Sequence, residues 1–83
     1  MPARGRDDSR HVRLRDFQRR FAVRVRALRE ERGLNQDALE SHGLSWKTVQ
    51  KLEYGKTNPK VSTLLKLCDA FKLTLTELLD LDS

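Results

Sequence analysis

The sequence predicts an all-α fold, a compact bundle of five short helices in a single domain. Apolar residues recur at helical spacing in several separate segments, and these segments begin at capping residues or end at glycines. The chain has 83 residues with four Gly, two Pro and few clusters of β-branched residues, which argues against an all-β fold. A chain of this size buries roughly 60% of its unfolded surface, enough for one small core.

The first helix is predicted to begin after Asp16, a suitable N-cap, and to end before Gly33, a suitable C′ residue. Most of the arginines in this segment lie away from its apolar face. The apolar residues recur every three or four positions and define that face: Phe17, Phe21, Val25 and Leu28.

Two short helices are predicted in the middle of the chain. Asn35 can cap the segment 36–42, which Gly43 closes after less than two turns. Ser45 is a good N-cap for the following helix, 46–53. The apolar side of that helix consists of Val49 and Leu52.

Two further helices complete the predicted bundle. Residues 54–60 contain Gly and Pro and indicate a loop, beneath which we expect Tyr54 to pack. Ser62 can cap a fourth helix, whose apolar residues include Leu64, Leu65, Leu67, Cys68 and Phe71. Thr74 and Glu77 have the spacing of a capping box. The last helix is strongly apolar for its length, with Leu75, Leu78, Leu79 and Leu81.

The charge is concentrated in the first part of the chain. Seventeen Lys and Arg face twelve Asp and Glu, which gives a net charge of +5. Residues 1–32 hold eleven Arg and five acidic residues, whereas residues 33–83 hold six Lys and seven acidic residues. We interpret residues 1–15 as a flexible basic arm and residues 16–83 as the folded domain. Such an arm suits phosphate binding, and the alternative is a solvated tail that only aids solubility.

The composition excludes several classes of protein. No run of about 18 apolar residues exists, so we expect no membrane span, and the first residues lack the apolar stretch of a secretory signal. The single cysteine, Cys68, excludes an internal disulfide and indicates a reducing, cytoplasmic setting. We expect Cys68 to be a buried small hydrophobe.

No pattern in the sequence indicates catalysis or metal binding. His11 and His42 lie far apart, and with one cysteine they offer no zinc-ligand spacing. No nucleophile motif occurs. We therefore predict a protein that is not an enzyme and that needs no metal or other cofactor.

The pair of short helices around Gly43 carries the functional signal. The helix 46–53 offers polar side chains on one side, and the DNA major groove is wide enough to admit one helix. Backbone N–H groups at the starts of both helices can meet phosphates. This arrangement favours a nucleic-acid-binding module.

Several spaced motifs resemble one known family. The stretch VRALREERGLNQ at 25–36 is similar to the opening of the Cro/cI-type helix-turn-helix family, the lambda-repressor-like domains. The stretch LEYGKTNP at 52–59 resembles the segment after that family's recognition helix, and 63–71 and 73–79 resemble its closing helices. The resemblance covers about residues 20–80 and implies a lambda-repressor-like five-helix bundle with a central helix-turn-helix.

The resemblance implies roles for individual residues. Gln36 would hold a DNA phosphate, and Lys56 and Asn58 in the following loop would approach phosphates. Arg29 and Glu53 match a structural salt bridge between the first helix and the end of the third. The groove-facing positions of the recognition helix would be Ser45, Trp46, Lys47, Thr48, Gln50 and Lys51. The alternatives are a merely solvated face for the lysines and Gln50, and packing against the neighbouring helix or loop for Trp46.

The chain departs from the family pattern between Gln36 and Gly43, where it is one residue shorter than usual. Glu40 also falls where the family prefers a small residue, and His42 stands where an apolar residue is usual. One deleted residue rotates the downstream residues by about 100° within an α-helix. We expect the turn to absorb this change.

The resemblance leads to the predicted function of a sequence-specific regulator of transcription that binds double-stranded DNA, such as a repressor. A homodimer would bind a palindromic operator, with the last helix (Leu75, Leu78, Leu79, Leu81) as the dimer interface. The alternative is that these leucines complete the core of the monomer. Two other functions stay open: an antitoxin-type module whose main partner is a protein, and non-specific nucleic-acid binding driven by the arginines.

Overall fold

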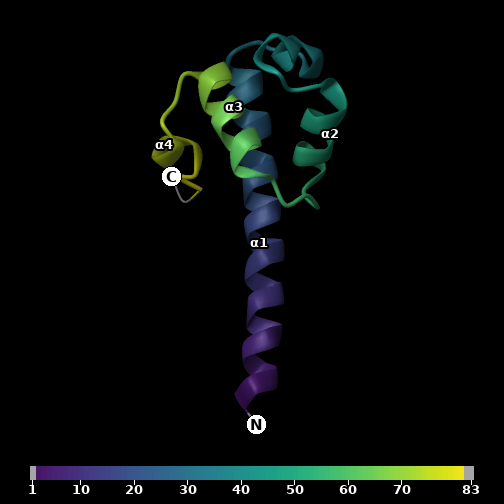
Figure 1. Ribbon diagram of the computed structural model, residues 1–83, viewed down its shortest axis with the longest axis vertical. Coiled ribbons are helices and arrows are strands. Elements are labelled where there is room, and N and C mark those ends of the chain that lie inside the picture. The colour runs from purple at the N-terminus through teal and green to yellow at the C-terminus, as the bar shows by residue number, and fades with distance from the viewer. Residues whose placement is uncertain (1, 82–83) are drawn as a thin grey trace.

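The computed structural model describes residues 2–81, with side chains from Arg13 onward. These residues form four α-helices and one 3-10 helix and contain no β-strand, which confirms the predicted all-α fold of five helices (Figure 1). The helices are α1 (Pro2–Glu31), η1 (Gln36–His42), α2 (Trp46–Tyr54), α3 (Val61–Phe71) and α4 (Leu75–Leu78).

Helix α1 is longer than predicted. It begins at Pro2, so the predicted start after Asp16 is wrong, and residues 2–15 continue the helix where the sequence indicated an arm (Figure 1). Proline suits a first turn, because the N–H group that it lacks has no helical partner there. Asp16 is instead a mid-helix residue that forms ion pairs with Arg19 (2.7 Å) and Arg20 (3.1 Å).

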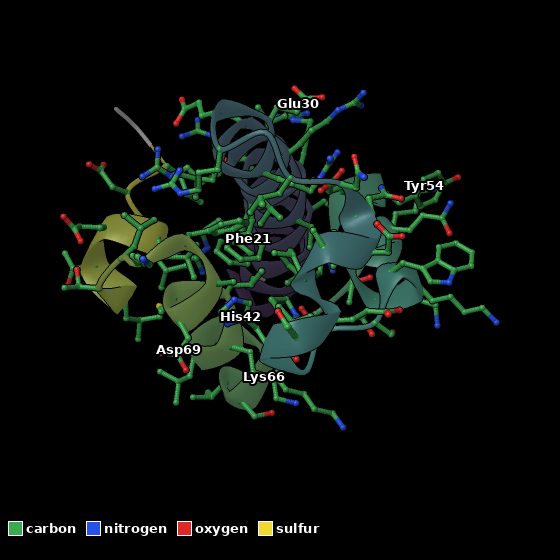
Figure 2. All side chains as sticks on the ribbon, turned by 90° about the horizontal axis from the view of Figure 1, so that it is seen from above. Phe21, Glu30, His42, Tyr54, Lys66 and Asp69 are labelled. Carbon is green, nitrogen blue, oxygen red and sulfur yellow. The ribbon has the colours of Figure 1, made fainter. Side chains whose placement is uncertain are left out.

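A single core lies between the C-terminal half of α1 and the remaining helices. Phe21 points into its centre, and α2 and α4 lie on opposite sides of the bundle (Figures 1 and 2). Full burial of one such side chain contributes about 1.5–3 kcal/mol to stability. The core consists of Phe21, Val25, Leu28, Leu39, Leu44, Val49, Leu52, Leu67, Cys68, Phe71 and Leu78.

Cys68 is one of these core residues, as the sequence predicted. Burial raises the pKa of its thiol, so the side chain is held in its neutral form. The residue therefore contributes packing to the core.

The segment between Gln36 and Gly43 is wound as a 3-10 helix. Seven residues at about 120° each turn by about 840°, whereas eight residues of α-helix at about 100° turn by about 800°. The tighter winding thus removes most of the rotation that one missing residue would cause. The shorter spacing is absorbed mainly within this helix, and Gly43 closes it in the left-handed conformation (φ 82°).

The structure confirms two predicted helix caps. The Ser45 hydroxyl accepts a hydrogen bond from the Thr48 backbone N–H (3.2 Å) at the start of α2. Thr74 and Glu77 form a reciprocal capping box at the start of α4. The two hydrogen bonds from Thr74, backbone first and then side chain, lower the pKa of the Glu77 carboxyl.

The predicted cap of the fourth helix is wrong. Helix α3 begins at Val61, and its N-cap is Lys60, which follows Pro59 in an extended conformation; Ser62 lies inside the first turn. The Lys60 carbonyl accepts the first helical hydrogen bond, from the Leu64 N–H (3.0 Å). Asn35 does occupy the N-cap position of η1, but its side chain makes no capping hydrogen bond.

The leucines after Thr74 mostly complete the core of the monomer. Leu78 is fully buried, which excludes it from the predicted dimer interface, and Leu79 and Leu81 pack against the core. Leu75 is 38% exposed and is the most exposed member of this set. Helix α4 ends at Leu78, so it is also shorter than predicted.

Lys72 ends α3 in a conformation that is unfavourable for its residue type. It is the one non-glycine residue with a positive φ (59°) among the described residues, and its N–H donates to the Cys68 carbonyl. A side chain with a Cβ in this left-handed region costs about 1–2 kcal/mol.

We expect Lys72→Gly to stabilise the fold by about 1 kcal/mol, because the relieved strain exceeds the added entropy of the unfolded chain. Lys72→Ala should bring no gain, because alanine keeps the Cβ. Urea unfolding followed by circular dichroism measures both. Equal stability of the two variants would contradict this explanation.

Candidate nucleic-acid interface

Helix α2 has one side fixed in the core and the other in solvent. Val49 and Leu52 are buried, and together they hold the helix against α1 and η1. On the other sides, Trp46, Lys47, Gln50 and Lys51 are exposed and Thr48 is half-buried. The Ser45 and Thr48 hydroxyls are 3.0 Å apart, so these two predicted contact residues also order the first turn.

A buried ion pair connects α1 to the end of α2. Arg29 Nε lies 2.7 Å from Glu53 Oε2 and Arg29 Nη2 lies 3.0 Å from Glu53 Oε1, a two-pronged contact. The side chains are only 12% and 6% exposed. The hydrogen bond to Glu53 raises the pKa of Arg29, so the guanidinium stays charged. The structure thus contains the salt bridge that the family resemblance implied.

The same pair also fixes the entry into η1. Arg29 Nη1 donates to the Leu34 carbonyl (2.7 Å), and the Gln36 amide donates to Glu53 Oε1 (3.4 Å). One guanidinium therefore organises the end of α1, the residues before η1 and the end of α2. Gln36, for which the resemblance implied a phosphate contact, is turned toward Glu53 and is half-buried.

Two aromatic side chains flank the exposed side of α2. Trp46 is 42% exposed and lies beside Lys47, whose ammonium is 6.0 Å from the ring centre. Tyr54 points away from the bundle (Figure 2) and is 73% exposed, so the prediction that it packs beneath the loop is wrong. The ammonium of Lys56 lies 5.4 Å from its ring centre. Each aromatic residue is thus paired with a lysine, a contact between a cation and a ring face.

The loop after α2 lies alongside the helix and against α1. Gly55 has a positive φ (86°), and a Cβ there would lie 3.5 Å from the Ala22 Cβ, so the loop passes close to α1. Thr57 donates to the Lys51 carbonyl (3.2 Å), which holds the loop on the end of α2. Lys56 and Asn58 are both exposed in this loop.

Shallow clefts join the loop to α2. Gln50, Lys51 and Lys56 line one cleft, and Lys51 and Asn58 line the next. The structure therefore places the predicted residues of α2 and of the loop next to one another. In the described part of the chain, no group of three His, Cys, Asp or Glu side chains could hold a metal ion, and no helix is long and apolar enough to cross a membrane.

Several arginines of the basic segment have structural roles that the sequence did not reveal. Arg24 donates to the Glu77 carbonyl (2.7 Å) and so connects α1 to α4. Arg32 donates to the Phe71 and Leu28 carbonyls and lies over the Phe71 ring. The guanidinium groups of both arginines thus donate hydrogen bonds to backbone carbonyls within the fold. Spacing along the sequence did not distinguish them from the exposed arginines of the same helix.

The fold and this site define a class of protein: a small all-α domain in which two short helices meet at a glycine and the second exposes its polar side. The family model for the helix-turn-helix matches residues 25–78, and the chain belongs to this family.

One curated relative is the HTH-type transcriptional regulator DdrOP3 of Deinococcus deserti. It is 38% identical over 62 residues, which are 74% of this chain and 48% of the relative. The chain thus spans about half the length of that protein. No solved structure matches the chain at a significant level.

We expect Arg29→Ala to destabilise the fold by about 3 kcal/mol or more, because it leaves the Glu53 carboxylate buried without its partner. Arg26→Ala is the matched control, since Arg26 pairs with Glu30 on the exposed side of the same helix and should cost less than about 1 kcal/mol. Chemical unfolding compares the two. An Arg29→Ala loss no larger than that of the control would show that the pair is not structural.

Proposed function

We propose that this protein is a sequence-specific regulator of transcription that binds double-stranded DNA and acts as a repressor in the cytoplasm. One observation carries the proposal: α2 presents a polar side to solvent while Val49, Leu52 and the Arg29–Glu53 pair fix its other side. A helix that is held rigidly and exposed along one side can enter the major groove as a unit.

The exposed side chains of α2 have the donors and acceptors that base recognition requires. A Gln50 amide suits the paired donor and acceptor of adenine, and lysines such as Lys47 and Lys51 suit guanine or phosphate. Trp46 offers an apolar surface to a thymine methyl group or a sugar. Ser45 and Thr48 border the same groove-facing side, where they hold the first turn of α2 in place.

Phosphate contacts would come from both ends of the helix pair. Lys56 and Asn58 lie exposed in the loop after α2. At the other end, Gln36 would use the amide hydrogen that its contact with Glu53 leaves free. Contacts to phosphates position a protein on DNA, whereas contacts to bases specify the sequence.

The relative supports the regulatory part of the proposal, since its name describes an HTH-type transcriptional regulator. In this proposal the protein acts by occupying DNA, without catalysis and without a cofactor.

We further propose that the protein binds a palindromic operator as a homodimer, since a two-fold protein matches two half-sites about 34 Å apart. With Leu78 in the core, the interface would use the large apolar side chains that remain exposed on α3 and α4: Val61, Leu65 and Leu75. Helix α4 lies on the opposite side of the bundle from α2, so such an interface leaves α2 free (Figure 1).

Selection from a random duplex pool at about 150 mM salt tests sequence-specific binding. We expect an enriched palindrome, and Gln50→Ala should lose about 1–3 kcal/mol of discrimination at one base pair of each half-site. Lys47→Ala should weaken binding. Lys66→Ala is its matched control, because Lys66 is an exposed lysine on α3 whose side chain points away from α2 (Figure 2). Absence of any enriched sequence would contradict the proposal and would favour phosphate attraction alone or a protein partner.

Sedimentation at micromolar concentration tests the homodimer. We expect a dimer that Leu65→Glu converts to monomer, because a buried unpaired carboxylate opposes association. Val23→Glu is the control, since Val23 is also apolar and exposed (66%, against 50% for Leu65) but lies on α1. A monomer for the unaltered chain at all concentrations would exclude the dimer.

A further inference from the structure

Besides the clefts that join the loop to α2, a basic groove runs between α1 and the end of α2. Its volume is about 710 Å³, and it opens to solvent. Three arginines of α1 line it: Arg15, Arg19 and Arg26. Lys56 of the loop, Ala22 and Tyr54 also line it.

The three arginines form a stripe on α1. Their positions, i, i+4 and i+11, fall within about 40° of one another on a helix at about 100° per residue. Ala22 occupies the i+7 position in the same stripe, and its small side chain admits the loop at Gly55. The close approach of Gly55 to α1 is therefore what sets Lys56 beside the arginine stripe.

The groove is continuous with the α2 surface. Tyr54 and Lys56 line both this groove and the cleft that contains Gln50 and Lys51. A ligand that extends along the exposed side of α2 thus meets Lys56 first and the arginine stripe next. Figure 1 shows α1 extending past the loop after α2, away from the other helices.

The cations of this groove are available to a ligand. Glu53, an acidic residue that also lines the groove, is neutralised by its buried contact with Arg29. Arg19 pairs with Asp16 while 76% exposed, and Arg26 pairs with Glu30 on the surface. Such exposed pairs contribute little, about 0–1 kcal/mol, so a phosphate can replace the carboxylate. No ion pair is seen for Arg15 among the described residues.

We propose that this groove binds backbone phosphates of the same DNA duplex, just beyond the base pairs that α2 contacts. Guanidinium groups match phosphate oxygens in pairs, which makes arginine well suited to this contact. The stripe from Arg15 to Arg26 is about 16 Å long, close to the rise of five base pairs at about 3.4 Å each. The proposal rests on the proposed function, because it is the continuity with the α2 surface that favours DNA over an acidic protein.

The test compares two double variants of the full chain with equal loss of charge. Arg15→Gln/Arg19→Gln removes two members of the stripe. Arg20→Gln/Lys66→Gln removes an arginine that helical spacing places about 100° away from the stripe and a lysine that lies on α3. Each double variant deletes one ion-pair partner of Asp16. Circular dichroism verifies that both keep the helical content of the unaltered chain.

The measurement is the salt dependence of binding to a mixed-sequence duplex of about 30 base pairs, which needs no knowledge of the operator. Each lost phosphate contact lowers the slope of log K against log salt by about 0.9. We expect the Arg15/Arg19 variant to lose about 1.8 from the slope and the Arg20/Lys66 variant to lose clearly less.

Equal slopes for the two variants would overturn the inference, because charge alone would then explain the loss. This result is independent of the selection experiment. If no sequence is enriched but the two slopes still differ, the groove binds phosphates and only the sequence-specific function fails. If a palindrome is enriched and the slopes are equal, the function stands and the groove plays no part in it.

Discussion

The buried contact between Arg29 and Glu53 is the interaction on which the rest of the site depends. An unpaired charge at this depth is costly, so the two side chains hold each other in one geometry. The same guanidinium binds the Leu34 carbonyl, and the same carboxylate accepts from Gln36. The end of α1, the entry into η1 and the end of α2 are therefore positioned together. The Arg29–Glu53 contact on the buried side of α2 therefore fixes the orientation of its exposed side.

The parts of the fold that local chemistry determines could be predicted from the sequence. Ser45 and the Thr74–Glu77 pair cap their helices by hydrogen bonds within three residues, so spacing alone reveals them. The start of α1 could not be predicted this way, because Asp16 suits an N-cap and a mid-helix ion pair equally well. The N-cap of α3 was missed because a backbone carbonyl of Lys60, rather than the Ser62 side chain, begins the helix.

The remaining differences arise from tertiary packing. Leu75 and Leu78 look alike in the sequence and lie three residues apart, yet Leu75 is partly exposed and Leu78 completes the core. Tyr54 is exposed because Gly55, in the left-handed conformation, turns the chain at the end of α2. The loop backbone then lies against α1, and the Tyr54 ring stays in solvent. The 3-10 winding of η1 likewise depends on how Leu39 and Leu44 must both reach the core across a shortened segment.

Net charge alone does not describe how the arginines of α1 act. Arg24, Arg29 and Arg32 bind carbonyls or a buried carboxylate, so their charges are committed to the fold. Arg15, Arg19 and Arg26 line the groove beside the end of α2 and make at most weak surface pairs. Because the neighbours that each side chain meets in the fold, rather than spacing along the helix, separate these two sets, one helix can both anchor the bundle and present cations beside α2. The basic character of the segment is therefore divided between arginines that stabilise the bundle and arginines whose charges stay at the surface beside α2.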